Sequence, residues 1–583
     1  MNMKKLLFLC LIIVSCSRDS NNDKSQSFTT IFEESKGLET ATYDQTIQFY
    51  SDLAESYNQI TIKPIGETDS GKPLHLVTLN TKGTGDDFNK LRDTNRILLI
   101  NNGIHPGESD GIDATMMLFR DIVQNKIDKP EKTILVTIPI YNVGGSLNRN
   151  SGTRTNQNGP QEYGFRGNAR NYDLNRDFIK SDSKNARTFA QIFHLVKPDV
   201  FIDNHVSNGA DYQYTLTHLF TQHNKMGGVL GNYINGRMIP NLEEKLKEKT
   251  WDVTPYVNVF NRTPDSGFTQ FMDSPRYSTG YTTLFNTLGM MVETHMLKPY
   301  QKRVEGTYEL MVSMIEIIEE EGDQIKALRN KQSKTWSAGR TYPLTWSIDT
   351  TKSSTLNFKG FEGFMIRSDL TGKQRLKYDR TKPFEKPVKY RNYFKSTSEI
   401  EIPKAYIIPQ GWHNVIDLVK LNDVVLSQLE KDTIIKVESY KIDDYKTRKS
   451  PYEGHYSHYA TKVKSFIEEI KFRKGDYLIY TDQTSIRYLL ETLEPEAVDS
   501  FFNWNFFDTI LQQKEGFSPY VWEDRANLVL RANPKLQIGF NLRKTFDKEF
   551  ADNWYAQLDW IHKQSGNYEK AHMQYPIYRV LKN

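Results

Sequence analysis

The sequence predicts a two-part α/β protein, built on a mixed, mostly parallel sheet with helices on both faces over residues 40–330. Short apolar runs alternate with segments of helical spacing along this stretch, a pattern typical of strands connected by helices. Residues 331–339 are polar and form a plausible linker. Beyond them, short strands separated by Gly, Asp and Lys predict a β-rich or α/β accessory module at 340–583, and its division into two subdomains stays open.

The first elements of the sheet region are a helix and a strand pair. Residues 42–55 have helical spacing, and 60–63 and 74–79 are strand-like. The run Thr-Asp-Ser-Gly-Lys at 68–72 is the turn between these strands. The apolar run 97–100 then predicts a buried strand, because it contains no polar residue and ends in Asn-Asn-Gly.

Buried strands and amphipathic helices continue to alternate after this point. Apolar runs predict strands at 134–140, 200–205 and 288–293. Apolar residues at helical spacing predict helices near 112–123, 186–196, 239–247 and 308–331. Residues 146–171 show no usable periodicity, and a loop of that length inside a domain indicates a functional segment.

The charge balance argues against a nucleic-acid partner. The chain has 583 residues with 76 basic and 72 acidic side chains, a formal net charge of +4. Nucleic-acid-binding proteins carry concentrated positive charge, which this composition does not show.

The amino terminus has the pattern of a secretion signal. Lys4 and Lys5 precede an apolar run at 6–14, followed by Ser15 and Cys16, so residues 1–15 are predicted to be a signal peptide. Ile-Val-Ser-Cys resembles a bacterial lipobox, which implies that Cys16 is lipidated and that residues 16–39 form a lipidated tether. The alternative is an ordinary secretion signal with an incidental cysteine.

These features predict where the protein resides. The chain has two cysteines. Cys10 lies in the segment to be removed and Cys16 would carry lipid, so no disulfide is expected. No other apolar stretch approaches the roughly 20 residues that span a bilayer. The protein is therefore expected to cross the inner membrane and to contact membranes only through its lipid, in the periplasm or on the cell-surface outer membrane.

Polar residues at strand ends and loops suggest a metal centre. The strand 97–100 leads into Asn-Asn-Gly-Ile-His-Pro-Gly-Glu, in which His105 and Glu108 can converge on one cation. His205 and Glu293 each end another apolar strand. Two histidines and a glutamate form a catalytic zinc set with one open position. Zinc lowers the pKa of bound water to about 7, and a separate carboxylate such as Glu293 suits a general base.

Four blocks of the chain resemble the carboxypeptidase A-like zinc metallocarboxypeptidases. The blocks are Gly-Ile-His-Pro-Gly-Glu at 103–108, Asp-Leu-Asn-Arg-Asp-Phe at 173–178, Ile-Asp-Asn-His-Val-Ser at 202–207 and Val-Glu-Thr-His at 292–295. They occur in the family's order within about residues 40–320. The resemblance implies a zinc carboxypeptidase-like fold with one Zn²⁺ per chain.

The resemblance also implies the roles of individual residues. His105, Glu108 and His205 would bind zinc, and Glu293 would activate the attacking water. Asn175 and Arg176 would hold the terminal carboxylate of the substrate, and a planar guanidinium suits that task. Asp173 would orient His105.

Two further assignments leave alternatives open. The arginine that stabilises the oxyanion would be Arg166, with Arg154 and Arg149 as alternatives. The mobile tyrosine of the family would be Tyr277, with Tyr281 as the alternative. Asn-Val-Gly-Gly at 142–145 departs from the family's Asn-Pro-Asp-Gly, which puts the specificity in doubt more than the chemistry.

The predicted function is zinc-dependent hydrolysis of carboxyl-terminal peptide bonds, with peptides that bear a free terminal carboxylate as substrates. A cell-wall-peptide or acylamino-acid amidohydrolase with the same zinc site is an alternative. A non-catalytic lipoprotein that binds a glycan or a partner is another. Arg276 either binds an acidic substrate group or pairs locally, His455 and His458 are expected on a surface loop, and the aromatic run 501–507 is expected in the core of the C-terminal module.

Overall fold

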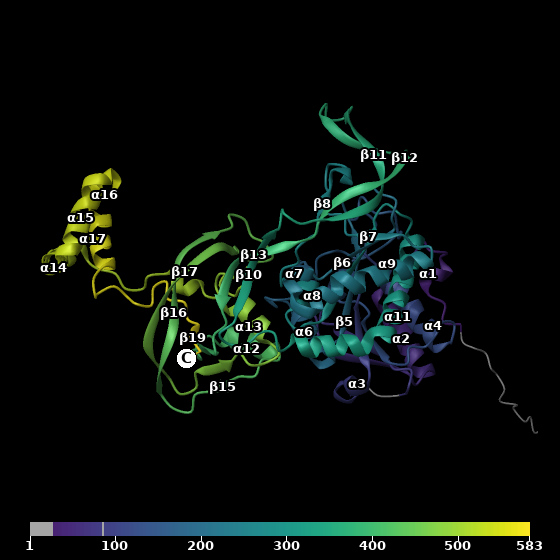
Figure 1. The fold of residues 1–583 in the computed structure, drawn as a ribbon, viewed down its shortest axis with the longest axis horizontal. Coiled ribbons are helices and arrows are strands. Elements are labelled where there is room, and N and C mark those ends of the chain that lie inside the picture. Colours follow the sequence, from purple (N-terminus) through teal and green to yellow (C-terminus); the bar gives the residue numbers. More distant parts are fainter. Residues whose placement is uncertain (1–26, 84–86, 583) are drawn as a thin grey trace, which may run out of the picture.

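The computed structural model describes residues 27–83 and 87–582. The predicted signal peptide and the predicted lipidation site Cys16 lie outside these residues. Within the described ranges, no helix is both long enough and apolar enough to cross a membrane. Figure 1 shows a helix-and-sheet body, a neighbouring β-rich body, a projecting hairpin and a small helical lobe.

An eight-stranded sheet forms the centre of the first body. Its strands are β1 (Ile60–Glu67), β2 (Pro73–Leu79), β3 (Arg96–Asn101), β4 (Thr133–Ile138), β5 (Val200–Ser207), β6 (Leu216–Phe220), β7 (Val253–Pro255) and β9 (Leu288–His295). They lie in the order β1-β2-β4-β3-β5-β9-β6-β7. β4, β3, β5 and β9 run parallel, whereas β2 and β6 pair antiparallel with them. The predicted mixed, mostly parallel sheet is confirmed.

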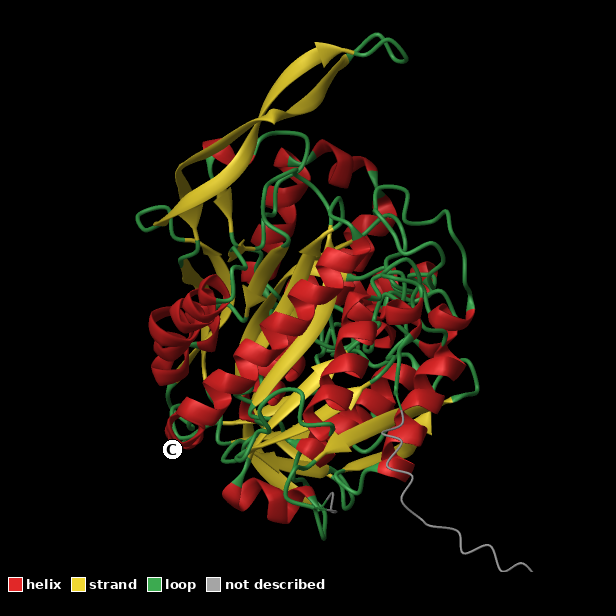
Figure 2. Ribbon diagram, turned by 90° about the vertical axis from the view of Figure 1, so that its right-hand side faces the viewer, coloured by secondary structure: helices red, strands yellow, loops and turns green. Residues whose placement is uncertain are grey.

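Helices cover both faces of this sheet (Figure 2). On one face, the side-chain amide of Asn204 in β5 donates to the sulfur of Met311, 3.7 Å away in α11 (Tyr300–Gln332). On the other face, Phe201 of the same strand packs edge-on against Phe189 of α6 (Lys184–Val196). Side chains alternate along a strand, so adjacent positions reach opposite faces. Further α-helices of this body are α2 (Tyr43–Ser56), α3 (Phe88–Thr94), α4 (Asp110–Val123), α5 (Val143–Leu147), α7 (His223–Met226), α8 (Gly228–Tyr233), α9 (Ile239–Glu248) and α10 (Ser278–Thr283).

Residues 27–39 differ from the prediction, which placed them at the end of the tether. They contain the short helix α1 (Ile31–Glu34), capped by Thr30 and Glu33. Phe28 and Phe32 are buried in the main core, and Arg120 of α4 donates to the backbone oxygen of Phe28 at 2.9 Å. The polar run before residue 27 led to a predicted tether that extended over the two phenylalanines. The folded body therefore begins earlier than the sequence indicated.

The second body combines strands and helices around a six-stranded sheet. The sheet has the order β15-β18-β14-β19-β16-β17, with β14 (Ala405–Ile408), β15 (Ser427–Gln428), β16 (Thr433–Thr447), β17 (His458–Phe472), β18 (Tyr477–Tyr480) and β19 (Tyr578–Val580). Two helices accompany it, α12 (His413–Leu421) and α13 (Ile486–Leu493). Phe501, Phe502, Trp504 and Phe507 are buried, as expected for residues of the core.

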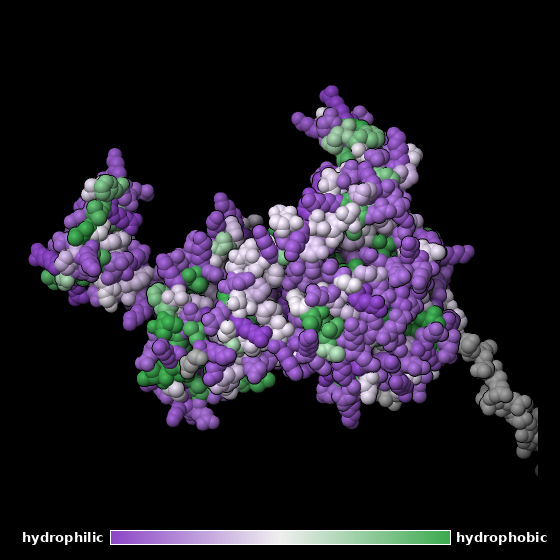
Figure 3. Space-filling model, viewed as in Figure 1, coloured by the Kyte–Doolittle hydropathy of each residue, from purple (hydrophilic) through white to green (hydrophobic). Residues whose placement is uncertain are grey.

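Two smaller parts project from these bodies. The antiparallel strands β11 (Ser354–Arg367) and β12 (Gln374–Arg391) form the hairpin, and β12 pairs with β8 (Phe268–Thr269) of the first body. Exposed Phe364, Met365 and Leu370 give an apolar patch near the end of the hairpin, beside hydrophilic residues (Figure 3). The helical lobe comprises α14 (Pro519–Ala532), α15 (Pro534–Phe546), α16 (Lys548–Asp552) and α17 (Trp554–Lys563), and β10 (Thr341–Ile348) pairs with β13 (Phe394–Glu401) between the bodies.

Candidate active site

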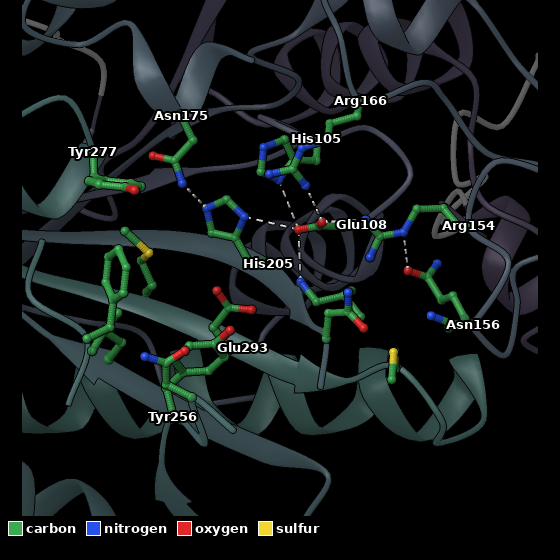
Figure 4. A pocket seen from close by; sticks show the side chains of 18 of the residues that line it. His105, Glu108, Arg154, Asn156, Arg166, Asn175, His205, Tyr256, Tyr277 and Glu293 are labelled. Carbon is green, nitrogen blue, oxygen red and sulfur yellow. Dashed lines mark hydrogen bonds and ion pairs between the residues drawn. The ribbon is translucent and has the colours of Figure 1, made fainter. Parts of the chain in front are cut away.

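A cavity of about 640 Å³ opens where β3, β5 and β9 end. Parallel strands bring their carboxyl ends to one edge of a sheet, which is where α/β proteins place ligands. His205 of β5 lies directly beside Glu293 of β9 in the strand register. The backbone N–H of Glu108 donates to the oxygen of His105 at 2.7 Å, a tight turn just after β3. The fold therefore brings all four predicted residues to one cavity (Figure 4).

His105, Glu108 and His205 form a group that could hold a metal ion. One candidate ligand atom of each lies within 4.8 Å of the others, and all three residues are buried. Nδ1 of His205 lies 3.0 Å from Oε2 of Glu108, and Nδ1 of His105 lies 3.3 Å from the same oxygen. That His105 nitrogen is buried and has no hydrogen-bond partner. Two imidazole nitrogens and a carboxylate are donors that zinc prefers, so the residues present fit a zinc ion.

Each histidine is oriented by a carboxylate that contacts the ring nitrogen facing away from the metal group. Nε2 of His105 lies 2.9 Å from Asp173, as the sequence resemblance implied, and Nε2 of His205 lies 3.0 Å from Asp203. Because an ionised carboxylate only accepts, both Nε2 atoms donate and both Nδ1 atoms face the metal group. Asp203 was missed in the sequence, although it stands two positions before His205 on the same face of a strand.

Neighbouring charges shift the pKa values of Asp173 and His205. Burial alone would raise the pKa of Asp173, but the charge and hydrogen bond of His105, together with Arg166 and Arg176, hold it well below its usual value. Burial also opposes the charge on His205, yet Asp203 and Glu108 raise the pKa of its imidazole well above the ordinary value. A histidine must be neutral to bind a metal ion, so zinc would compete with protons for His205.

In the view of Figure 4, Glu293 lies between His205 and Tyr256. Burial raises the pKa of the Glu293 carboxyl to about 7; the His205 charge opposes this shift, and Glu108 and Asp203 reinforce it. A carboxylate with a pKa close to the working pH can both take and return a proton. Tyr256, which also lines the cavity, was not predicted because its surroundings in the sequence have no periodic pattern.

Of the three candidate arginines, Arg154 and Arg166 line the cavity. Nη1 of Arg154 donates to Oε1 of Glu108 at 2.6 Å. Arg166 pairs with Asp173 at 2.9 Å and approaches Glu108 only to 3.6 Å. Arg149 lies apart, where it donates to the backbone oxygen of Glu162. Both arginines are therefore paired and both face the cavity, and the side chain of Arg166 is the more exposed, 43% against 18% for Arg154.

The predicted carboxylate-binding residues also line the cavity. Asn175 lies in a short 3₁₀ turn (Leu174–Arg176), with Nδ2 3.5 Å from His205 Nε2. The guanidinium of Arg176 lies over the ring of Tyr277 at 4.5 Å, and its contact with Asp173 is long, at 4.0 Å. Tyr281 is fully buried and donates to Asn422 instead. Of the two tyrosine candidates, only Tyr277 reaches the cavity.

A family model has a match within this region. Residues 46–198 match the model described as Zinc carboxypeptidase. The matched zinc carboxypeptidase segment contains His105, Glu108, Asp173, Asn175 and Arg176, and it ends before His205 and Glu293. The geometry described above places these last two residues beside the matched ones.

Comparisons over most of the chain find similarity to proteins that are named carboxypeptidases. The chain is 21% identical over 514 residues to "Carboxypeptidase 2" of Trichophyton rubrum, covering 82% of this chain and 87% of that protein. The protein of the same name from Trichophyton tonsurans is 21% identical over 504 residues, covering 80% and 84%. Among solved structures, a metallo-carboxypeptidase from Burkholderia cenocepacia is similar with a TM-score of 0.36, at 15% identity over 48% of this chain and 70% of that one. The carboxypeptidase A of Helicoverpa armigera has a TM-score of 0.34, at 12% identity, covering 51% and 74%.

Proposed function

We propose that the protein is a zinc-dependent carboxypeptidase that removes carboxyl-terminal amino acids from peptides. The observation that carries the proposal is the arrangement of one cavity. Its lining includes the metal group His105, Glu108 and His205, the buried carboxylate Glu293, and the cationic side chain of Arg176. A metal group beside a proton acceptor and a carboxylate-binding cation is the set that exopeptidase chemistry requires.

Each of these cavity residues has its own role in the proposed reaction. Bound zinc would supply Lewis acidity for polarising the scissile carbonyl. Glu293 takes a proton from the attacking water and later returns it to the leaving amine nitrogen. Arg166 stabilises the negative charge that develops on the carbonyl oxygen. Asn175, Arg176 and Tyr277 hold the terminal carboxylate, which places the last peptide bond next to Glu293.

The deciding experiment is to measure zinc content and the release of amino acids from a peptide panel with and without a chelator. One zinc per chain and chelator-sensitive release from the carboxyl end support the proposal. The same panel includes cell-wall peptides and acylated amino acids, which separates the amidohydrolase alternatives. A protein that binds zinc but releases nothing from any member would rule out the hydrolase.

Arg176→Ala is expected to lower kcat/KM for peptides with a free terminal carboxylate. A hydrogen bond to a charged group contributes about 2 to 3 kcal/mol, so we expect a loss of roughly 30- to 150-fold. The same peptides as carboxyl-terminal amides should lose little, because they lack the charge that Arg176 recognises. Steady-state kinetics on acid and amide pairs measures this selectivity.

Arg170→Ala is the matched control for Arg176→Ala. Arg170 lies six positions before Arg176, stacks on Tyr172, is an exposed residue and is not among those that line the cavity. Its removal should leave the ratio of acid to amide hydrolysis unchanged. Equal losses on acid and amide substrates in Arg176→Ala would show that Arg176 does not bind the carboxylate.

We further propose that the mature protein is a lipoprotein anchored through Cys16 and facing the periplasm or the cell exterior. The support is the lipobox-like sequence Ile-Val-Ser-Cys after an apolar run. Cys16→Ala should release the protein from the membrane fraction, because two or more acyl chains are what hold a protein stably on a bilayer. Cys10→Ala, inside the predicted signal peptide, should stay anchored. A Cys16→Ala protein that remains with membranes would disprove the anchor.

A further inference from the structure

A loop of the C-terminal region reaches the predicted carboxylate-binding segment. This bracing loop, residues 448–457, joins β16 to β17. It is a tight turn, because Tyr452 and His455 pair with each other and the intervening Glu453 and Gly454 have φ of +49° and +80°. A Cβ at Gly454 would lie 2.9 Å from the hydroxyl oxygen of Tyr172. Glycine therefore allows the loop to approach the first body closely.

Glu453 makes the most direct contact with the site. Its Oε2 accepts a hydrogen bond of 2.9 Å from the backbone N–H of Asp173. Asp173 in turn holds His105 through its side chain and accepts from the backbone N–H of Asn175 at 3.0 Å. A carboxylate from the C-terminal region thus fixes the residue on which both the metal group and Asn175 depend.

An ion-pair chain extends this contact to the end of the same segment. Nε2 of His455 lies 2.7 Å from Asp182. Lys180, whose side chain is fully buried, pairs with Asp182 at 2.6 Å and with Asp177 at 2.7 Å. Its ammonium group also lies over the ring of Trp504 at 5.6 Å. Residues 172–182, which include Asn175 and Arg176, are therefore held at both ends from the C-terminal region.

Tyr277, which lies across the predicted carboxylate-binding site from residues 172–182, is also held by the C-terminal region. Its neighbour Arg276 donates from both Nε and the backbone N–H to Asp499, at 2.8 and 3.0 Å. The guanidinium of Arg276 lies over the rings of Trp504, at 4.8 Å, and Tyr452, at 5.6 Å. Arg276 therefore pairs within the protein and does not take an acidic substrate group, which decides between the two roles considered from the sequence.

We propose that the C-terminal region is a working part of the substrate site, in which the bracing loop orders residues 172–182 and so fixes the carboxylate-binding side chains. Glu453 and His455 are positioning residues: neither lines the cavity, and they act through Asp173 and Asp182. The inference rests on the proposed function for its catalytic consequence only. Misplacement of binding groups by about 1 Å costs a large factor in rate, so a loop that fixes these groups affects how well the substrate is held for reaction.

The test compares three variants of the full-length zinc-loaded protein. Glu453→Ala removes the acceptor of the Asp173 N–H, Glu453→Gln keeps an acceptor oxygen in the same place, and Glu430→Ala changes an exposed carboxylate elsewhere in the C-terminal region. Hydrogen exchange of the backbone amides in 172–178 measures order directly. In Glu453→Ala we expect exchange to accelerate by about 10-fold, while the other two variants stay near wild type.

Kinetics provides the second readout. In Glu453→Ala, KM for peptides with a free carboxylate should rise by about 10-fold with a much smaller change in kcat, and Glu453→Gln should restore it. Loss of stability alone would lower the amount of active protein and leave KM unchanged. Unchanged exchange or an unchanged KM in a folded Glu453→Ala protein would overturn the inference.

A further variant guards against a Glu453→Ala protein that does not fold. His455→Ala removes the donor to Asp182 and leaves Glu453 in place, and faster exchange of the amides in 178–183 is expected. Wild-type exchange there would overturn the inference as well. Absence of carboxypeptidase activity in the wild type would defeat the proposed function, whereas hydrogen exchange would still decide whether the loop orders the segment.

Discussion

Glu293→Gln is expected to lower kcat by about 10³-fold while the protein keeps its zinc. The glutamine amide has nearly the shape of the carboxylate but cannot take a proton from water. Glu293 lies at the carboxyl end of β9 beside His205, so the variant removes the proton acceptor and leaves the metal ligands in place. Steady-state kinetics on a peptide with a free terminal carboxylate, together with metal analysis, measures both quantities.

Glu244→Gln provides the comparison for this result. Glu244 is an exposed carboxylate on α9, away from the cavity, and its replacement should change neither kcat nor zinc content. Zinc-loaded Glu293→Gln that turns over at the wild-type rate would remove Glu293 from the mechanism. Loss of zinc in Glu293→Gln would instead show that Glu293 supports the metal group.

His205→Ala is expected to abolish both stable zinc binding and turnover. Only His105 and Glu108 would remain, and two protein ligands are fewer than the three typical of catalytic zinc sites. Because the ion supplies several kcal/mol of stabilisation in the transition state, the rate should fall by about 10⁴-fold or more. Metal analysis after dialysis and the same peptide assay check the two outcomes.

Asp203→Asn gives a graded comparison with His205→Ala. It keeps all three ligands and weakens the contact that orients His205, while Asp203 also accepts from Ser278 and Asn101, so zinc affinity should fall by about 10- to 100-fold. Competition with a chelator measures that affinity directly. A His205→Ala protein that holds zinc as tightly as the wild type would show that the ion binds elsewhere.

The sequence predicted the sheet and the metal group for one physical reason. Each ligand follows or ends a strand apolar enough to be buried, and parallel buried strands bring their ends together. The runs before His105, His205 and Glu293 are of this kind. A local pattern thus carried information about positions that are far apart in the chain.

The rest of the site had no such local signal. Asp203 lies inside a strand where it stands out only as a polar residue, and Tyr256 lies in an irregular segment. The contact between Asp173 and Glu453 spans 280 positions and depends on a turn in a different sheet. Residues 27–39 follow a polar run that obscured Phe28 and Phe32. Apart from the Asp203–His205 contact, which lies within one strand, the decisive contact is tertiary in each case, and no spacing along the chain encodes it.

The ion pair between Arg276 and Asp499 has a consequence for where the protein can be divided. The side chain of Asp499 is fully buried and that of Arg276 is 14% exposed, so the two charges neutralise each other largely shielded from water. Ending the chain in the polar run 331–339 would remove Asp499 and uncover Arg276 and the packing surface around it. Breaking a buried pair by removing one partner costs about 3 to 5 kcal/mol, a large share of a domain's stability. The change of composition near residue 335 marks a boundary in sequence, whereas a buried ion pair and one continuous hydrophobic core join the two bodies across it.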